Sequence, residues 1–131
     1  EGMQIPIWAS ASGKLLLAQL PPEQYTRVVD KLSIYALTTN TQTDRQQLLA
    51  TIARAKSEQL SVDNEEFIPG MVAFAVPIPN GDGAPFATLF TPGPTVRKSL
   101  DELLAYAPAM RRAAAELALV FQKQGAEAGS D

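Results

Sequence analysis

The spacing of apolar residues predicts three helices in the first half of the chain. Residues 10–20 are nearly all apolar after two serines that could cap a helix, a pattern typical of a buried helix. A pair of prolines ends this segment and starts the next, residues 22–32, whose apolar positions follow the i, i+3, i+4, i+7 spacing of an amphipathic helix. Thr43, with Gln46 three residues later, fits a capping box for a third helix that runs to about Gln59. The positions expected to face inward on that helix are Leu48, Leu49, Ile52 and Ala53.

Two apolar segments after these helices flank a strong hairpin signal. The segments are residues 71–79 and 84–91, and the sequence Asn-Gly-Asp-Gly separates them at residues 80–83. Such a sequence favours a tight turn between antiparallel strands. Because Pro77 and Pro79 lack a backbone N–H, we expect the end of the first strand to lie at an edge of the sheet.

Two further segments are predicted to be strands. Residues 3–9 form a short apolar segment, and residues 60–67 form a segment with an acidic patch. Side chains alternate between the two faces of a strand, which would place Asp63 and Glu65 on one face and Glu66 on the other.

The last third of the chain predicts one long helix. Ser99 and Glu102 fit a second capping box at its start. Apolar residues then recur at spacings of three and four as far as Phe121, which gives one apolar stripe. Pro108 lies inside the pattern and predicts a kink near Ala107.

The order of the predicted elements indicates the fold class. Grouped helices followed by an antiparallel hairpin are typical of an α+β fold. The chain has 131 residues and neither a linker nor an internal repeat, so it suits one compact domain, which we place at residues 1–124. Residues 125–131 are small and polar, and we expect a disordered tail there.

Composition excludes several classes of function. The sequence contains no cysteine and no histidine, which excludes thiol nucleophiles and removes the commonest general base and metal ligand. The net charge is −3 and no basic stripe is present, so the chain offers no surface for a DNA backbone. We therefore expect no catalytic residue, metal or cofactor. No apolar run reaches the length of a membrane span and no signal-peptide pattern is present, so a cytoplasmic domain without membrane contact is expected.

Three stretches of the chain, in this order, are similar to one protein family. Residues 9–24 hold a small polar pair, Gly-Lys, a Leu/Ala helix and a helix that starts with proline. Residues 60–78 hold an Asp-x-Glu-Glu strand, a glycine four residues on and an apolar strand that ends near Val-Pro. Residues 80–97 hold a glycine turn, an alanine-containing strand, Gly-Pro and an arginine. Together, over roughly residues 9–122, they resemble the effector-binding domain of IclR-type bacterial transcription regulators.

This resemblance implies a GAF-like domain, a curved antiparallel sheet with flanking helices, that senses a small molecule and is not an enzyme. It also implies a homodimer or tetramer, in which the effector biases the conformation and promoter binding of attached winged helix-turn-helix domains. That DNA-binding domain, and the helix and first strands that open the family's sensing domain, are not found in this sequence. Promoter DNA would be contacted only through the absent domain.

The resemblance further implies an effector pocket. The positions that match the family's effector contacts are Ala11, Ser12, Asp63, Ala73, Phe90 and Pro92. The last two depart from the family, because members that sense small keto acids have serines there and Phe90 offers no hydroxyl. A phenyl ring fills space or stacks on an aromatic ligand. We therefore expect a carboxylate-bearing effector that is aromatic, or more apolar than a two- or three-carbon acid.

The residues at 10–14 have a chemistry of their own. The N-terminus of a helix presents free N–H groups and a positive partial charge, which favour a carboxylate. Ser10 and Ser12 add hydroxyl donors, and Gly13 would let a ligand approach the backbone closely. Plain capping of a buried helix explains the same residues equally well.

Two other functions remain open from the sequence. Phe90 could fill the cavity and leave a ligand-free dimerisation module. The acidic patch could act as a general acid or base, or hold a hard cation. The pattern favours a solvated strand with Glu65 or Glu66 as one buried structural acid, and Lys14 could pair with one of the acids across the fold.

Overall fold

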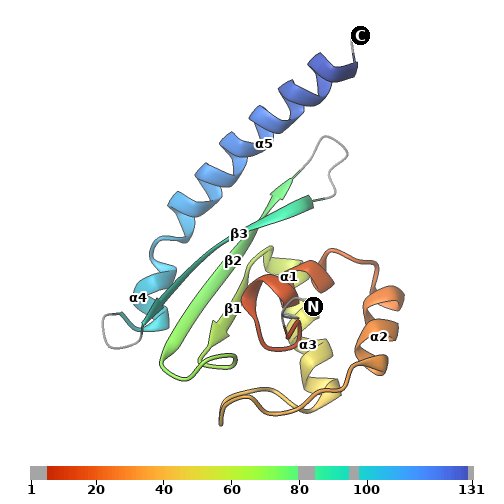
Figure 1. The fold of residues 1–131 in the computed structure, drawn as a ribbon, viewed down its shortest axis with the longest axis vertical. Helices are drawn as coiled ribbons and strands as arrows, with labels where there is room; N and C mark the ends of the chain where they lie inside the picture. The colour runs from red at the N-terminus through yellow and green to blue at the C-terminus, as the bar shows by residue number, and fades with distance from the viewer. Residues whose placement is uncertain (1–5, 80–84, 95–97, 130–131) are drawn as a thin grey trace, which may run out of the picture.

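The computed structural model describes residues 6–79, 85–94 and 98–129. Its elements, in chain order, are α1 (Ala11–Ala18), α2 (Pro22–Lys31), α3 (Arg45–Glu58), β1 (Ser61–Asn64), β2 (Met71–Pro79), β3 (Pro85–Pro94), α4 (Leu100–Leu104) and α5 (Ala107–Gly129). The sheet lies between two groups of helices, with α1, α2 and α3 on one side and α4 and α5 on the other (Figure 1). The predicted α+β fold is confirmed.

The described strands form one antiparallel sheet in the order β1-β2-β3. Residues directly opposite each other on neighbouring strands carry their side chains on the same face. The two rows of opposed residues that matter for the site are Asp63, Ala73 and Pro92, and next to it Ser61, Ala75 and Phe90.

The prolines of β2 lie where the sequence predicted. β1 pairs with β2 only from Ser61, opposite Ala75, to Asn64, opposite Val72. Among the described strands, the segment with Pro77 and Pro79 therefore pairs with β3 alone, and the expected edge position is confirmed. The turn predicted at residues 80–83 lies outside the described residues, but the antiparallel pairing of β2 with β3 agrees with it.

Side chains alternate between the two faces of β2, and each face belongs to a different core. On the face toward α1, Ala73 and Ala75 pack against Ala11 and Leu15. The residues between them point to the opposite face and pack against α4 and α5. The buried members of this second core are Val72, Phe74, Val76, Ile78, Leu103, Ala114 and Ala118.

The segment before α1 is a turn and not the strand that was predicted for residues 3–9. Residues 1–5 lie outside the description, and residues 7–9 form a turn. The N–H groups of Ala9 and Ser10 both donate to the carbonyl of Pro6, at 2.9 and 3.0 Å. These local hydrogen bonds replace the ladder that a strand would need.

The start and the buried face of α3 each differ from the prediction by a small shift. The N-cap is Asp44 and not Thr43, because the Asp44 carboxylate accepts hydrogen bonds from the N–H groups of Gln46 and Gln47. Ala53 is exposed, and Ala55 is buried in its place with Leu48 and Ile52.

The C-terminal segment forms two helices where one kinked helix was predicted. The capping box of Ser99 and Glu102 is confirmed at the start of α4. Helix α4 ends at Leu104, and α5 begins at Ala107. Pro108 therefore lies in the first turn of α5, where a missing N–H costs no helical hydrogen bond. Helix α5 continues to Gly129, so residues 125–129 are helical where a disordered tail was predicted.

Candidate functional site

The N-terminus of α1 keeps two backbone donors available. Ser10 is the N-cap, and its Oγ accepts a hydrogen bond from the N–H of Gly13 at 3.0 Å. The first helical hydrogen bond runs from the N–H of Lys14 to the carbonyl of Ser10. Among the described residues, the N–H groups of Ala11 and Ser12 have no acceptor. These two amides, at the positive end of the helix dipole, are suited to bind an anion.

Gly13 is required by the packing of the chain itself. A Cβ at this position would lie 2.6 Å from both the Cα of Ile7 and the Oγ of Ser10. No side chain fits against the turn before α1 without displacing it. This contact explains the glycine, so the close approach of a ligand, which the sequence suggested as its purpose, is not needed to account for it.

The buried acid of the site is Asp63 in β1. Its side chain is 5% exposed, and its Oδ1 accepts a hydrogen bond from the N–H of Glu66 at 2.7 Å. Burial raises the pKa of the Asp63 carboxyl above its ordinary value, because the charged form loses its water. The hydrogen bond that the Glu66 N–H donates lowers the pKa of Asp63, but by less than burial raises it.

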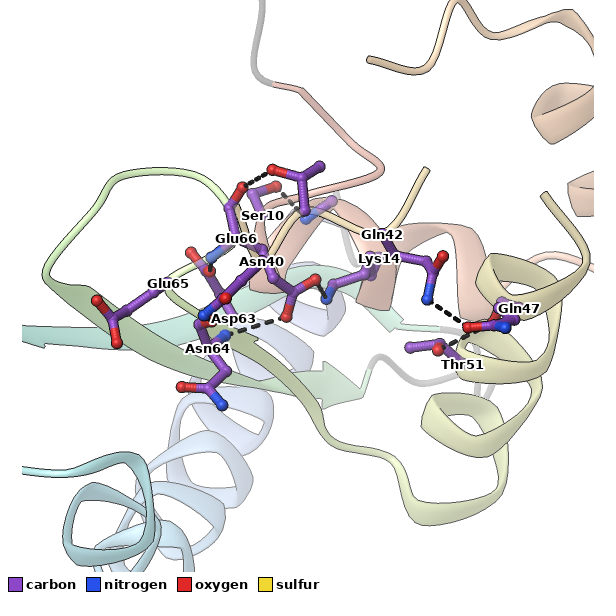
Figure 2. Close-up of polar contacts among 12 residues, drawn as sticks. Ser10, Lys14, Asn40, Gln42, Gln47, Thr51, Asp63, Asn64, Glu65 and Glu66 are labelled. Carbon is purple, nitrogen blue, oxygen red and sulfur yellow. Dashed lines mark hydrogen bonds and ion pairs between the residues drawn. The ribbon is translucent and has the colours of Figure 1, made fainter. Parts of the chain in front are cut away.

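A buried ion pair joins α1 to the turn after β1. The Nζ of Lys14 lies 2.7 Å from Oε1 of Glu66, and the two side chains are 1% and 13% exposed (Figure 2). The second carboxylate oxygen of Glu66 accepts from the N–H of Asn64 at 3.0 Å. The predicted pairing of Lys14 with one of the acids is confirmed, and that acid is Glu66. The prediction that Glu65 or Glu66 is the buried acid is wrong, because Asp63 is the buried one and both glutamates are half-buried.

Glu65 does not share the face of Asp63. β1 ends at Asn64, and Glu65 has a φ of 58°, in the left-handed region. The predicted alternation of the acids is therefore wrong beyond Asn64. The Oε1 of Glu65 accepts from the N–H of Gly70 at 3.0 Å, so this carboxylate holds the turn that leads to β2.

Two threonines hold the acidic turn from a distant loop, and sequence reasoning missed both. The Thr38 hydroxyl donates to the carbonyl of Glu65 at 2.5 Å, and the Thr41 hydroxyl donates to the carbonyl of Glu66 at 2.6 Å. The Oγ1 of Thr41 also accepts from the N–H groups of Leu37 and Thr38. No local pattern signals contacts between residues that lie 25 to 27 positions apart.

The structure brings together most of the predicted binding residues. Ala11 packs with Ala73 beneath α1, and Asp63 and Pro92 stand on either side of Ala73 in one cross-strand row. Phe90 belongs to the adjacent row. The side chains of Phe90 and Pro92 lie outside the described part, and Ser12 occupies the first turn of α1 beside the two available amides. Ligand contact by these residues stays a prediction.

Ser61 is a polar residue of the same face that the sequence analysis did not single out. It is 4% exposed, and its Oγ has no hydrogen-bond partner in the part of the chain that the structure describes. It lies two positions before Asp63 in β1, so the period of the strand alone could have placed it on that face.

A separate polar pocket lies beside β1. Its volume is about 450 Å³, and it is lined by the Lys14–Glu66 pair together with polar side chains that include Asn40, Thr51 and Arg54. None of the predicted binding residues lines it. The ion pair thus borders this pocket, while Glu66 also holds Asp63 through its backbone (Figure 2).

Among the described residues, no three histidine, cysteine, aspartate or glutamate side chains come together in a group that could hold a metal ion. No helix among them is long and apolar enough to cross a membrane.

The fold is that of the C-terminal domain of bacterial transcription regulators. The structure matches a transcriptional regulator from Rhodococcus sp. RHA1 with a TM-score of 0.88 and 29% identity, over 93% of this chain and 50% of that one. It also matches the PobR inducer-binding domain from Acinetobacter, solved as a double mutant in complex with 3-hydroxybenzoic acid. That match has a TM-score of 0.83 and 31% identity, over 88% of this chain and 67% of that one.

The chain belongs to the IclR family. Residues 1–119 match the family described as bacterial transcriptional regulator IclR, C-terminal. The probable transcriptional regulator SauR from Cupriavidus necator is 36% identical over 120 residues, which are 92% of this chain and 48% of that protein. The chain thus spans about half the length of this relative, and both the family and this relative are described as transcriptional regulators.

Proposed function

We propose that this chain is the effector-sensing domain of an IclR-type transcription regulator. A small carboxylate-bearing molecule binds between the first turn of α1 and the sheet face that carries Asp63. The observation that carries the proposal is the placement of a buried acid, on a face of small side chains, beneath a helix whose first amides lack acceptors. Family membership supports a sensor over a catalyst.

Each part of this face has a role in binding. The carboxylate of the effector accepts hydrogen bonds from the N–H groups of Ala11 and Ser12, where the helix dipole favours negative charge. Asp63 faces the effector from the sheet, and burial raises the pKa of its carboxyl above the ordinary value. Ala73 contributes a small apolar side chain to the face on which the body of the effector would lie.

An aromatic acid fits this site best. Phe90 belongs to the row next to Asp63, and a phenyl ring favours stacking or an apolar body over a two- or three-carbon acid. The complex of the Acinetobacter relative with 3-hydroxybenzoic acid supports the same class of ligand.

Effector binding shifts the populations of two conformations of the regulator. The Lys14–Glu66 pair connects the binding helix to the loop around Thr41, so movement of α1 reaches the surface beside β1. In the whole protein, a homodimer or tetramer in the cytoplasm contacts promoter DNA through a winged helix-turn-helix domain outside this chain.

Thermal unfolding with ligand tests this proposal. The panel contains benzoate, 3-hydroxybenzoate, 4-hydroxybenzoate, phenylacetate, pyruvate and glyoxylate, each at millimolar concentration. An aromatic acid at one hundred times its Kd should stabilise the domain by about 2.7 kcal/mol and raise its Tm. Asp63→Asn should weaken binding, whereas Asp30→Asn, which changes an exposed acid, should not. A flat response to the whole panel would refute the sensor function.

A ligand-free dimerisation module is the alternative that one observation favours. Leu119 and Val120 of α5 are 66% and 49% exposed, which is unusual for large apolar side chains on adjacent positions. If this alternative holds, sedimentation equilibrium gives a dimer that Leu119→Ser weakens, and no acid in the panel changes its Tm.

A further inference from the structure

The hydroxyl of Ser61 is buried without a partner. Its side chain is 4% exposed, and its Oγ makes no hydrogen bond. Nearly all buried polar side chains in folded proteins are hydrogen-bonded, because an unpaired group loses water and gains nothing in return. A serine in this position therefore needs a reason beyond packing, since alanine would fill almost the same space.

The position of Ser61 places this hydroxyl on the proposed binding face. Ser61 lies two residues before Asp63 in an extended strand, so both side chains point to the side of α1. Its cross-strand neighbour is Ala75, which packs with Ala11 and Leu15 of α1. Its cross-strand neighbour thus offers only a methyl group, and no described residue donates to the hydroxyl or accepts from it.

The spacing of Asp63 and Ser61 suggests what the hydroxyl recognises. A strand rises about 3.4 Å per residue, so the two positions lie roughly 7 Å apart along β1. Ala73 and Ala75 stand opposite them, and both are small and apolar. The two polar groups therefore stand about 7 Å apart along β1, beside small apolar side chains that pack against Ala11 and Leu15 of α1.

We propose that Ser61 is a specificity-determining residue, whose hydroxyl hydrogen-bonds a second polar substituent of the effector. The effector is then a carboxylic acid with a ring-sized apolar body and a hydroxyl or carbonyl group at the far end from its carboxylate. This inference rests on the proposed function, since it assigns the second polar contact of the same site. Phe90, at the other end of the row of Ser61, has no hydroxyl to offer in its place.

The first test needs no ligand. If the Ser61 hydroxyl makes its hydrogen bond only with the effector, then Ser61→Ala removes an unsatisfied buried group from the ligand-free chain. Its Tm should therefore rise by about 2–8 °C. Ser57→Ala, which removes an exposed hydroxyl from α3, serves as the matched control and should change the Tm by less than about 2 °C. A lower Tm for Ser61→Ala would mean that the hydroxyl stabilises the free protein, and would overturn the inference.

The second test compares acids in matched pairs with and without a hydroxyl group. Benzoate is measured against 3- and 4-hydroxybenzoate, and phenylacetate against 4-hydroxyphenylacetate, by calorimetric titration. The wild-type chain should prefer the hydroxylated member of a pair, and Ser61→Ala should reduce that preference about 5- to 10-fold, while leaving the affinity for the unsubstituted acid unchanged.

The outcomes separate the two claims. Acids that bind without preference for the hydroxyl, or a preference that survives in Ser61→Ala, would overturn the role of Ser61 and leave the sensor function in place. If no acid of either set binds the wild-type chain, the proposed function fails and the role of Ser61 fails with it.

Discussion

The ion pair between Lys14 and Glu66 gives the sharpest prediction of stability. At 2.7 Å, and with an effective dielectric constant of about 20, the attraction between the two charges is about 6 kcal/mol before desolvation is counted. Desolvation offsets much of this gain, so the pair as a whole adds little. Removing only one charge is different, because the other charge stays buried without a partner.

We therefore expect Lys14→Met to lower the free energy of unfolding by about 3–5 kcal/mol. Lys14 is 1% exposed and Glu66 is 13% exposed, so removal of the lysine leaves a carboxylate that is largely shielded from water and has lost the opposite charge. The double variant Lys14→Met/Glu66→Leu should recover most of the loss, because no unpaired charge remains.

Urea denaturation of the wild type, Lys14→Met, Glu66→Leu and the double variant gives the coupling free energy between the two side chains. Lys31→Met, which removes an exposed lysine from the last turn of α2, controls for the loss of a charge alone and should change stability by less than about 0.5 kcal/mol. A loss below about 1 kcal/mol in Lys14→Met, or a double variant no more stable than the singles, would refute this reasoning.

Three further predictions concern the same region. Because the pKa of Asp63 is raised in the folded state, the native chain holds the Asp63 proton at pH values where the unfolded chain has lost it. The free energy of unfolding of the wild type should therefore fall as pH rises from about 3.8 through that raised pKa. Urea titrations at pH 4 and pH 7 should show that Asp63→Asn lacks this fall, and a parallel decline in the variant would contradict it. Gly13→Ala should lower the Tm despite the better helix propensity of alanine, because its Cβ would meet Ile7 at 2.6 Å, at a cost of about 1–3 kcal/mol; an unchanged Tm would show that the turn yields. Thr41→Val should cost about 1–3 kcal/mol in circular-dichroism melts, since it leaves the carbonyl of Glu66 unsatisfied, and a neutral result would mean that water replaces the hydroxyl.

The helices and the fold class could be predicted because their signals are local. The apolar run of α1 and the capping box of Ser99 and Glu102 each depend on residues within four positions of one another. The start of α3 lies one residue later than predicted because Asp44 competes with Thr43 for the same role, and its side chain accepts hydrogen bonds from two backbone N–H groups.

The geometry of the site could be predicted only in part. The family pattern brought Ala11, Asp63 and Ala73 to one face, as the packing and the register confirm. The alternation of the acids failed at Glu65, because a single left-handed residue ends the strand and the period of two no longer applies. The lack of a hydrogen-bond partner for Ser61 could not be predicted, because it depends on residues that are close in space but distant in the sequence.

The hydrogen bonds of the Asn64 backbone also bear on strand pairing between separate molecules. β1 has one free edge among the described strands, and such an edge is a template on which a strand from another chain can pair. At Asn64, the N–H already donates to Glu66 and the carbonyl already accepts from the amide of Asn40. A foreign strand finds both groups occupied there, so this end of the sheet resists the intermolecular pairing that leads to aggregation in a concentrated solution.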